Sequence, residues 1–104
     1  NNVFGARLRI TTLRAQAGPG VELLEYLTPR DGRPTPADLK ANDIAHWQVQ
    51  LVVADVSAAY RVAQEARASL VSGGGIVLPD PRLGFQRGAL LRDPDAHAVE
   101  LVEP

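Results

Sequence analysis

Hydrophobic and polar residues alternate along the first part of the chain with the two-residue period of a half-buried strand. Between residues 5 and 14, leucine, isoleucine and threonine side chains alternate with arginines and a further threonine. A second alternating run, residues 21–27, follows the turn sequence Ala-Gly-Pro-Gly of residues 17–20. The pattern therefore predicts a hairpin of two strands.

The strand pattern breaks between residues 28 and 42, where prolines and charged residues are frequent. Such a segment is too polar and too rich in proline for a sheet ladder, and it predicts a linker. Strand character resumes at residues 46–53, and apolar residues then recur at helical spacing from residue 58 onward. Asp55 or Ser57 can cap this helix. The hydrophobic period therefore changes from that of a strand to that of a helix.

Short apolar runs follow the helix at residues 69–72, 75–78 and 85–92, separated by glycines and by an Asp-Pro pair. Each run is typical of a short strand. The Asp-Pro-Asp turn of residues 93–95 leads into a last strand, residues 98–102. A hairpin, one helix and several further strands predict an α+β fold.

The last strand repeats a part of the hairpin. Residues 21–25 read Val-Glu-Leu-Leu-Glu and residues 99–103 read Val-Glu-Leu-Val-Glu, each after a strand and a turn. Residues 4–29 therefore form an imperfect copy of residues 85–104, which indicates two copies of one supersecondary unit. The second copy is complete as a strand, a helix and three strands, whereas the first has only its closing strands.

This repeat predicts three segments: the closing strands of a first module (residues 1–29), a linker (residues 30–42) and a second module (residues 43–104). If the two copies are equivalent, we expect a stretch of roughly 40 residues with a strand and a helix before Asn1. The chain has no initiator Met at Asn1, which agrees with that expectation.

Composition narrows the function classes. Eleven basic and twelve acidic residues give a formal net charge of -1, which favours neither nucleic acid nor a membrane surface as a partner. The chain has no cysteine, so a metal would have to be held by His, Asp or Glu. No apolar run approaches the roughly 18 residues of a membrane span, and the first residues lack a signal-peptide pattern. We expect a soluble, cytoplasmic domain whose partners are small molecules or protein.

Two glutamates, Glu22 and Glu100, stand inside otherwise apolar strands. A carboxylate in that position is costly to bury unless it is paired, hydrogen-bonded or bound to a metal. Glu22 shares one strand face with Tyr26, which gives that face the character of a pocket. Both glutamates are therefore candidate site residues.

The strand at residues 46–53 has a polar face and an apolar face. The polar face carries His46, Gln48 and Gln50. A polar row opposite an apolar row is typical of a sheet with one water-accessible face. The polar side chains either line a site or simply meet solvent, and the pattern alone leaves both interpretations open. We expect the other face to form continuous core, made of Trp47, Val49, Leu51 and Val53.

Three segments carry a family resemblance. They are residues 45–49 (Ala-His-Trp-Gln-Val), residues 53–55 (Val-Ala-Asp) with the helix after them, and residues 92–101 (Arg-Asp-Pro-Asp-Ala-His-Ala-Val-Glu-Leu). Together they are similar to the second module of vicinal oxygen chelate proteins, the superfamily of glyoxalases, bleomycin resistance proteins and extradiol dioxygenases. Residues 20–27 resemble the closing strand of a first module. The resemblance implies paired βαβββ modules that form a half-open barrel around a divalent metal, with the first module lacking its N-terminal strand and helix in this chain.

The resemblance also implies a set of metal ligands. His46 matches the ligand that opens the second module, Glu100 the ligand in its last strand, and Glu22 the glyoxalase-type ligand that closes the first module. A fourth ligand belongs to the first strand of the first module, which this chain does not contain. Such a set suits Zn, Ni, Mn or Fe. In a site of the extradiol dioxygenase type, His46 and Glu100 would instead complete a facial triad for Fe(II), and Glu22 would lie outside the metal shell.

From the same resemblance we expect a metal-dependent enzyme, a lyase, isomerase or dioxygenase, that chelates two neighbouring oxygens of a small substrate. Glu22 or Glu100 would serve as both ligand and proton-transferring base. Tyr26, Gln48 and Phe85 would form part of the pocket wall.

Two other function classes stay open. One is a metal-free small-molecule-binding protein of the same fold, like the resistance proteins that sequester antibiotics. The other is a structural or dimerising module, because two half-modules can complete each other across a dimer in this superfamily. Unpaired sheet edges favour such pairing, so we expect a homodimer.

Three features near the end of the chain carry less weight. His97 is expected to hold the turn before the last strand rather than to act in catalysis. Ala96 stands where the family turn commonly has glycine, which leaves the geometry of this turn open. The glycines of residues 73–75 are not followed by a helix, so we expect a flexible hairpin there and not a phosphate loop.

Overall fold

The computed structural model describes residues 3–104 and divides into two compact units. The N-terminal unit ends at Arg33, and the C-terminal unit spans Pro34–Pro104. The fold is α+β, with two sheets and one α-helix among the described residues. Neither of these sheets closes into a barrel. Residues 3–104 contain no helix with the length and apolar character needed to cross a lipid bilayer.

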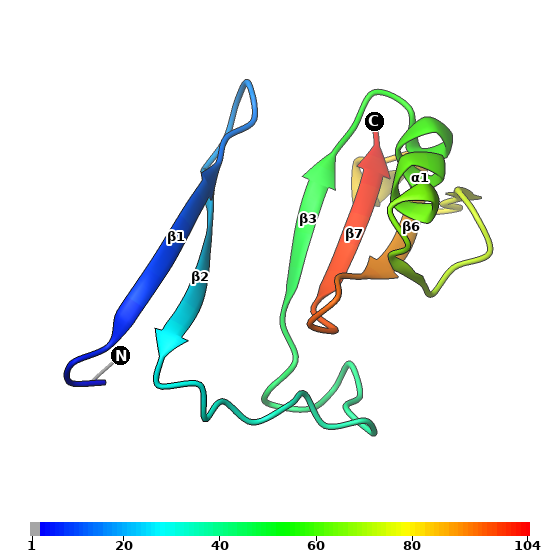
Figure 1. Ribbon diagram of the computed structural model, residues 1–104. Helices are drawn as coiled ribbons and strands as arrows, with labels where there is room; N and C mark the ends of the chain where they lie inside the picture. The colour runs from blue at the N-terminus through cyan, green and yellow to red at the C-terminus, as the bar shows by residue number, and fades with distance from the viewer. Residues whose placement is uncertain (1–2) are drawn as a thin grey trace. The chain divides into compact units, whose positions relative to one another are not determined.

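The N-terminal unit is a hairpin of β1 (Arg7–Leu13) and β2 (Val21–Thr28), which pair in antiparallel fashion (Figure 1). The ladder closes with Leu13 opposite Val21. In the connecting loop Gly18 has a φ of 88°, a conformation that glycine adopts readily. The hairpin predicted from the alternating pattern is confirmed.

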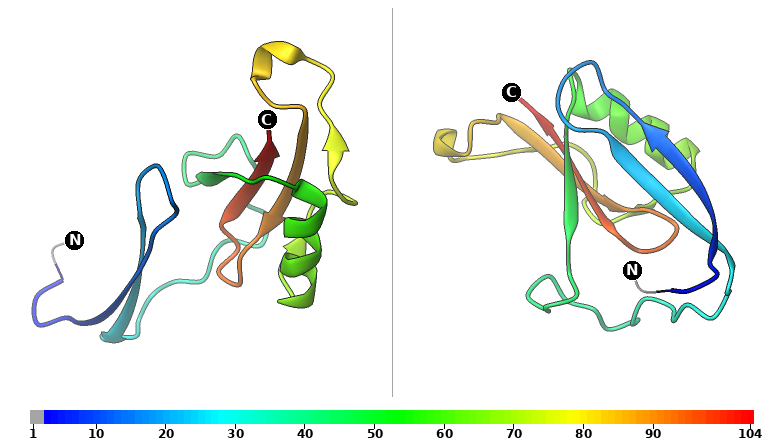
Figure 2. Two further views of the ribbon diagram at one scale, coloured as in Figure 1. Left: turned by 90° about the horizontal axis from the view of Figure 1, so that it is seen from above. Right: turned by 90° about the vertical axis from the view of Figure 1, so that its left-hand side faces the viewer.

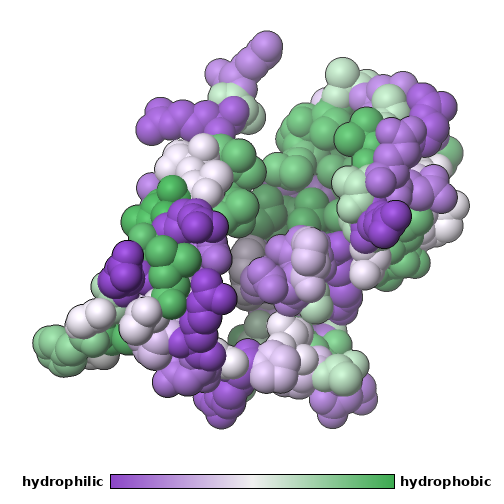
Figure 3. Space-filling view, in the orientation of Figure 1, coloured by the Kyte–Doolittle hydropathy of each residue, from purple (hydrophilic) through white to green (hydrophobic). Residues whose placement is uncertain are grey.

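This hairpin has no buried core of its own. Every residue of β1 is exposed, and β2 buries no residue completely. Hydrophobic side chains lie between polar ones on the surface of the hairpin (Figure 3). A two-stranded sheet is at best marginally stable in water without such a core. The large apolar side chains that its strands leave exposed are Leu8, Ile10, Leu13, Leu23 and Leu24.

The C-terminal unit is built on a mixed five-stranded sheet in the order β3-β7-β6-β4, with β5 paired to β6. β3 (Gln48–Val52) runs parallel to β7 (Ala98–Glu103), and β6 (Arg87–Arg92) runs antiparallel to β7. β3 and β6 lie on either side of β7 (Figure 1). β7 is therefore an interior strand, and β3 is an edge strand.

The helix α1 (Val56–Glu65) packs against β6 and β7 on one face of this sheet (Figure 2). Asp55 caps the helix by accepting a hydrogen bond from the backbone N–H of Ala58 at 2.9 Å. Glu103 of β7 accepts a second one from the backbone N–H of Val56, also at 2.9 Å. Two carboxylates therefore stabilise the positive end of the helix. The buried core between helix and sheet consists of Val56, Ala89, Leu91 and Leu101.

Four strands follow the helix, as the apolar runs predicted, whereas the repeat predicted three. β4 (Ser69–Leu70) and β5 (Ile76–Val77) have two residues each. Both pair with β6, β4 at its end and β5 at its start, so together they form one interrupted edge of the sheet. The interruption contains Gly73, Gly74 and Gly75, and the hairpin expected there is not formed, because β4 and β5 pair with β6 and not with each other. Gly75 is packed closely, because an added Cβ atom would lie 2.9 Å from Cγ1 of Val56.

The Asp-Pro break after β5 forms a short 3-10 turn, η1 (Pro81–Leu83). The side chain of Asp80 accepts a hydrogen bond from the backbone N–H of Arg82 at 3.0 Å. Gly84 ends the turn with a φ of 77°. The pattern predicted only a break here, because a single short turn has no hydrophobic period to detect.

The continuous apolar core predicted for one face of residues 46–53 is wrong in part. Trp47 is 52% exposed and Leu51 is 41% exposed. α1 packs against β6 and β7, so the edge strand β3 lies beyond the area that the helix covers. Val53, by contrast, does pack against the buried cluster. The strand also begins at Gln48 rather than residue 46, after a turn whose residues do not join the ladder.

Candidate functional site

Glu100 lies inside β7 on the sheet face that α1 does not cover. Its sequence neighbours Val99 and Leu101 point to the opposite face, where Leu101 belongs to the core and Val99 packs against it. Glu100 itself is half-buried. A half-buried carboxylate inside a strand needs polar partners.

Gln48 and Gln50 of β3 provide these partners. Nε2 of Gln50 donates to Oε2 of Glu100 at 2.9 Å, and Nε2 of Gln48 donates to the same oxygen at 3.1 Å. Gln50 is opposite Glu100 in the parallel ladder, and Gln48 lies two residues earlier on the same face. The parallel pairing of β3 with β7 thus brings the three side chains together. We call Gln48, Gln50 and Glu100 the Glu100 cluster.

Apolar residues border the Glu100 cluster on the same face. Leu90 of β6 is opposite Glu100 in the antiparallel ladder and is half-buried. Val102 is two residues further along β7 and is fully buried. Gln48 and Gln50 themselves are exposed, so water reaches the outer side of the cluster. A few convergent polar groups with an apolar border are typical of a small-molecule site.

The cluster can offer either hydrogen bonds or oxygen ligands. In the present orientation, both amide groups donate to the carboxylate. Rotation of a carboxamide by about 180° exchanges its NH2 group with its oxygen, which would then face the same space. One carboxylate with amide oxygens is a donor set that hard divalent cations accept.

His46, an expected metal ligand, is half-buried in the turn before β3. Its backbone N–H donates to the carbonyl of Asp43 at 3.0 Å. His46 lies two residues before the first residue of β3, Gln48, and does not join the ladder with β7. Gln48, expected only as pocket wall, is therefore the residue that reaches Glu100, while the ligand role of His46 stays a prediction.

Phe85, another expected wall residue, is half-buried and lies two residues before β6. Gln50 was not singled out as a site residue, although it makes the shorter bond to Glu100. The signal that could have identified it is the polar row of His46, Gln48 and Gln50, since alternate residues share a strand face.

Glu22 and Tyr26 lie on β2 of the N-terminal unit. Glu22 is exposed and stands opposite Thr12, and Tyr26 is half-buried and stands opposite Leu8. The two side chains share one strand face, as predicted. They belong to a different unit from the Glu100 cluster, so their role in a common site stays a prediction.

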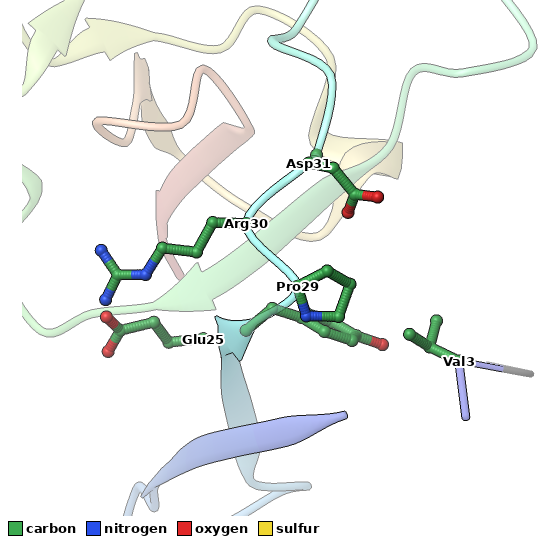
Figure 4. A pocket seen from close by; sticks show the side chains of 7 residues that line it. Val3, Glu25, Pro29, Arg30 and Asp31 are labelled. Atoms are coloured by element: carbon green, nitrogen blue, oxygen red, sulfur yellow. The ribbon is translucent and has the colours of Figure 1, made fainter. Parts of the chain in front are cut away.

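A shallow pocket of about 520 Å³ lies beside Tyr26 in the N-terminal unit. The side chains of Arg30 and Asp31 extend in opposite directions from the segment after β2 (Figure 4). Glu25 at this pocket pairs with Arg9 at 2.9 Å, and both side chains are exposed. The pocket contains no residue of the Glu100 cluster. Its lining consists of Val3, Glu25, Tyr26, Pro29, Arg30, Asp31 and Gly32.

Asp93 holds the turn between β6 and β7. Its Oδ1 accepts the backbone N–H groups of Asp95 and His97 at 2.9 Å each, and its Oδ2 lies 3.0 Å from Nδ1 of His97. Burial raises the pKa of the Asp93 carboxyl, but the hydrogen bonds from the His97 side chain and backbone outweigh this effect, and the pKa lies below its ordinary value. His97 thus holds the turn, as expected. Ala96 adopts a φ of 69°, the left-handed conformation that glycine would adopt at lower cost.

The donor types of the Glu100 cluster fit a divalent ion, but their number does not complete a site. Within residues 3–104, no three His, Asp or Glu side chains converge in a way that could hold a metal. Structural and catalytic metal sites commonly use at least three protein ligands. A metal at Glu100 would therefore need ligands from beyond the cluster.

Comparison with known proteins identifies no relative. No family model, no curated protein and no solved structure matches the chain. The function must therefore be argued from the residues and their geometry.

Proposed function

We propose that the chain is part of a metal-dependent enzyme of the vicinal oxygen chelate type, which binds a small substrate through two neighbouring oxygens. One observation carries the proposal: Gln48 of β3 and Glu100 of β7 meet 3.1 Å apart on the sheet face that the helix leaves open. The two family-like segments, residues 45–49 and 92–101, are the ones that supply these side chains. Sequence resemblance and side-chain geometry therefore point to the same place.

The fold that accompanies this proposal is a half-open barrel of paired βαβββ modules. The order of β3, α1 and the strands that end in β7 supports a second module, with the helix on one face and the Glu100 cluster on the other. β1 and β2 would be the closing strands of the first module, because their Val-Glu-Leu segment repeats that of β7.

In this proposal Glu100 and the amide oxygen of Gln48 would hold the metal. His46 and Glu22 are the further ligands that the resemblance implies. The ion would be Zn, Ni, Mn or Fe, which accept carboxylate and imidazole ligands. Such an ion, when bound with open positions, polarises two substrate oxygens and stabilises the negative charge that develops on them.

Glu100 is also the best candidate for moving a proton. Gln50 stands opposite Glu100 and donates to its Oε2, which fixes the orientation of the carboxylate. A carboxylate held in this way can take a proton from the carbon beside a substrate carbonyl and return it. Glu22 is the second candidate base, and Tyr26 and Phe85 would complete the pocket wall.

A metal-free small-molecule-binding protein of the same fold is the second candidate function. It is favoured by the two amide hydrogen bonds that Oε2 of Glu100 already receives, because this network satisfies the carboxylate without an ion. The cluster would then recognise hydroxyl or amine donors of a ligand through the carboxylate.

The proposed partners are a small molecule and a second copy of the chain. β3 is an edge strand, and its residues Leu51 and Val52 are exposed. An exposed apolar edge favours pairing with another strand, so a homodimer is expected. Light scattering of the purified protein measures the mass that decides between monomer and dimer.

Elemental analysis separates the two candidate functions. The full chain is produced with Zn, Ni, Mn and Fe in the medium and compared with Glu100→Ala, Gln48→Ala and the matched control Glu65→Ala, which changes an exposed carboxylate on α1. The enzyme proposal predicts stoichiometric metal in the wild type and the control, and its loss in Glu100→Ala. A wild type without metal would contradict the enzyme and favour the binding protein.

A further inference from the structure

Two aromatic rings meet at the point where the pairing of β3 with β7 begins. The ring centroids of Trp47 and His97 lie 4.5 Å apart, with an angle of 35° between the ring planes. The first pair of this parallel ladder is Gln48 with Ala98, and the two rings belong to the residues directly before them. The contact between these two side chains therefore lies one residue pair before the backbone ladder begins.

Asp93 holds His97 from the β6–β7 turn. Nδ1 of His97 lies 3.0 Å from Oδ2 of Asp93. Because an ionised carboxylate can only accept hydrogen bonds, Nδ1 must be the donor. Nε2 is therefore the nitrogen of His97 that is open to a further proton. The side chain of His97 is 38% exposed, so the ring can exchange protons with water.

Other titratable groups lie on the three segments that adjoin this contact: the β6–β7 turn, the residues before β3 and the linker. On the turn itself are Asp95 and Arg92, whose Nη1 donates to the carbonyl of Ala96 at 2.7 Å. On the segment before β3, His46 is adjacent to Trp47. The linker touches the turn through the hydroxyl of Thr35, which donates to the carbonyl of Asp95 at 2.8 Å. The titratable residues between Thr35 and His46 are Asp38, Lys40 and Asp43.

We propose that protonation of His97 strengthens its contact with Trp47, so that the ring pair acts as a pH-sensitive clasp on the start of β3. An imidazolium between the Asp93 carboxylate and the indole ring is attracted by both. The neutral ring makes only the aromatic contact and one ordinary hydrogen bond. The clasp rests on these contacts alone and is independent of the proposed enzyme function.

The position of the clasp gives it an effect on the Glu100 cluster. β3 is paired on one side only, so its first residues are held by few hydrogen bonds. Gln48 is the first residue of β3, and its amide reaches Glu100. Tightening of the clasp therefore orders the end of the strand that supplies this contact.

Tryptophan fluorescence reports the contact directly, because Trp47 is the only tryptophan and the chain has just two histidines. An imidazolium in contact with an indole quenches its emission. In the full chain, we expect emission to fall along one sigmoid as the pH is lowered from about 8 to about 5. The fall should persist in His46→Gln. It should be absent in His97→Phe, which keeps a ring beside Trp47 without a titratable nitrogen.

Hydrogen exchange tests the effect on β3. After correction for the intrinsic pH dependence of exchange, protection of the β3 amides should be about threefold higher at low pH than at high pH, as a cation–π contact at an exposed site allows. In His97→Phe the protection should not change with pH. If that variant does not fold, Asp93→Asn serves instead, and the change should be smaller than in the wild type. Three results would each overturn the clasp. They are tryptophan emission that does not change with pH, loss of the transition in His46→Gln, and equal protection of the β3 amides at both pH values.

Discussion

The same short sequence lies in two very different environments in the two units. In β2 and in β7 a Val-Glu-Leu segment pairs with the strand before it in antiparallel fashion. Leu23 of β2 is 51% exposed, whereas Leu101, its counterpart in β7, is 5% exposed. The local sequence thus determines the strand and its pairing, but not its burial.

The difference comes from the element that covers the sheet. α1 packs against β6 and β7 and buries the side chains that point toward it, including Leu101. Within Asn1–Arg33 the described residues form strands and connecting segments only. Most stability of a small sheet comes from apolar side chains that another layer removes from water. The C-terminal unit has such a layer, and the hairpin does not.

Separating the two units should give the largest effect. We expect a fragment of residues 34–104 to give a dispersed NMR spectrum and cooperative thermal unfolding. A peptide of residues 1–33 should give the spectrum of an unfolded chain, since a lone hairpin is at best marginally stable in water. Cooperative unfolding of the isolated peptide would contradict the comparison.

Substitution of the two equivalent leucines should give the next largest effect. Leu101→Ala removes a side chain from the buried core and should lower the free energy of unfolding of the C-terminal unit by about 3 kcal/mol. Leu23→Ala changes an exposed side chain and should alter the free energy of unfolding of the full chain by about 0.5 kcal/mol or less. Urea denaturation of the full chain measures both values. Equal losses would show that burial does not separate the two copies.

The sequence predicted the main elements of the fold but not the exposure of every residue in them. Alternation located both strands of the hairpin, and helical spacing located α1, because both signals are local. The exposure of Trp47 was not predicted, because an alternating pattern does not tell how far a helix extends across a sheet. The strands β4 and β5 are shorter than the apolar runs predicted, because the glycines between them interrupt the edge and Gly75 packs closely against Val56 of the helix.

The turns of the two copies differ as well, and Asp93 tests that difference. Asp93→Asn keeps an oxygen for the backbone N–H groups but loses the charge that pairs with His97. We expect a loss of about 1 kcal/mol near neutral pH, measured by urea denaturation. The hairpin turn of residues 17–20 has no acidic residue, so no equivalent substitution exists there.

The pH dependence of this loss has a definite sign. The folded-state pKa of Asp93 lies below its ordinary value of 3.8. The ionised carboxylate therefore contributes its full stability above that value, and the contribution is lost as the pH falls through the lower folded-state pKa. The gap between wild type and Asp93→Asn should narrow below about pH 4. A gap that widened below about pH 4 would contradict a lowered folded-state pKa of Asp93.

The smallest effect is expected at Ala96, in the same turn. Its φ of 69° is unfavourable for a residue with a Cβ atom. Ala96→Gly relieves that strain but gives the unfolded chain more freedom, so we expect a net gain of about 0.5 kcal/mol. A thermal melt that shifts upward by a few degrees supports this, and a downward shift would show that the turn is not strained.

The candidate site was predicted only in part. The two glutamates were found because a carboxylate in an apolar strand needs a partner, and Glu100 does have two. The hydrogen-bond partners of Glu100 are Gln48 and Gln50, which the parallel register places beside it. His46 lies before the start of β3. That start is determined by the turn before β3, and the alternating pattern does not show where this turn ends.

A titration of the full chain with Mn²⁺, followed through the NMR signals that the paramagnetic ion broadens, tests the proposed metal site at the Glu100 cluster. We expect the side-chain amides of Gln48 and Gln50 and the backbone amide of Glu100 to broaden first, and Glu100→Ala to remove this preference. Broadening that begins at exposed acidic residues such as Asp31 and Asp38, with the Glu100 cluster unaffected, would contradict it.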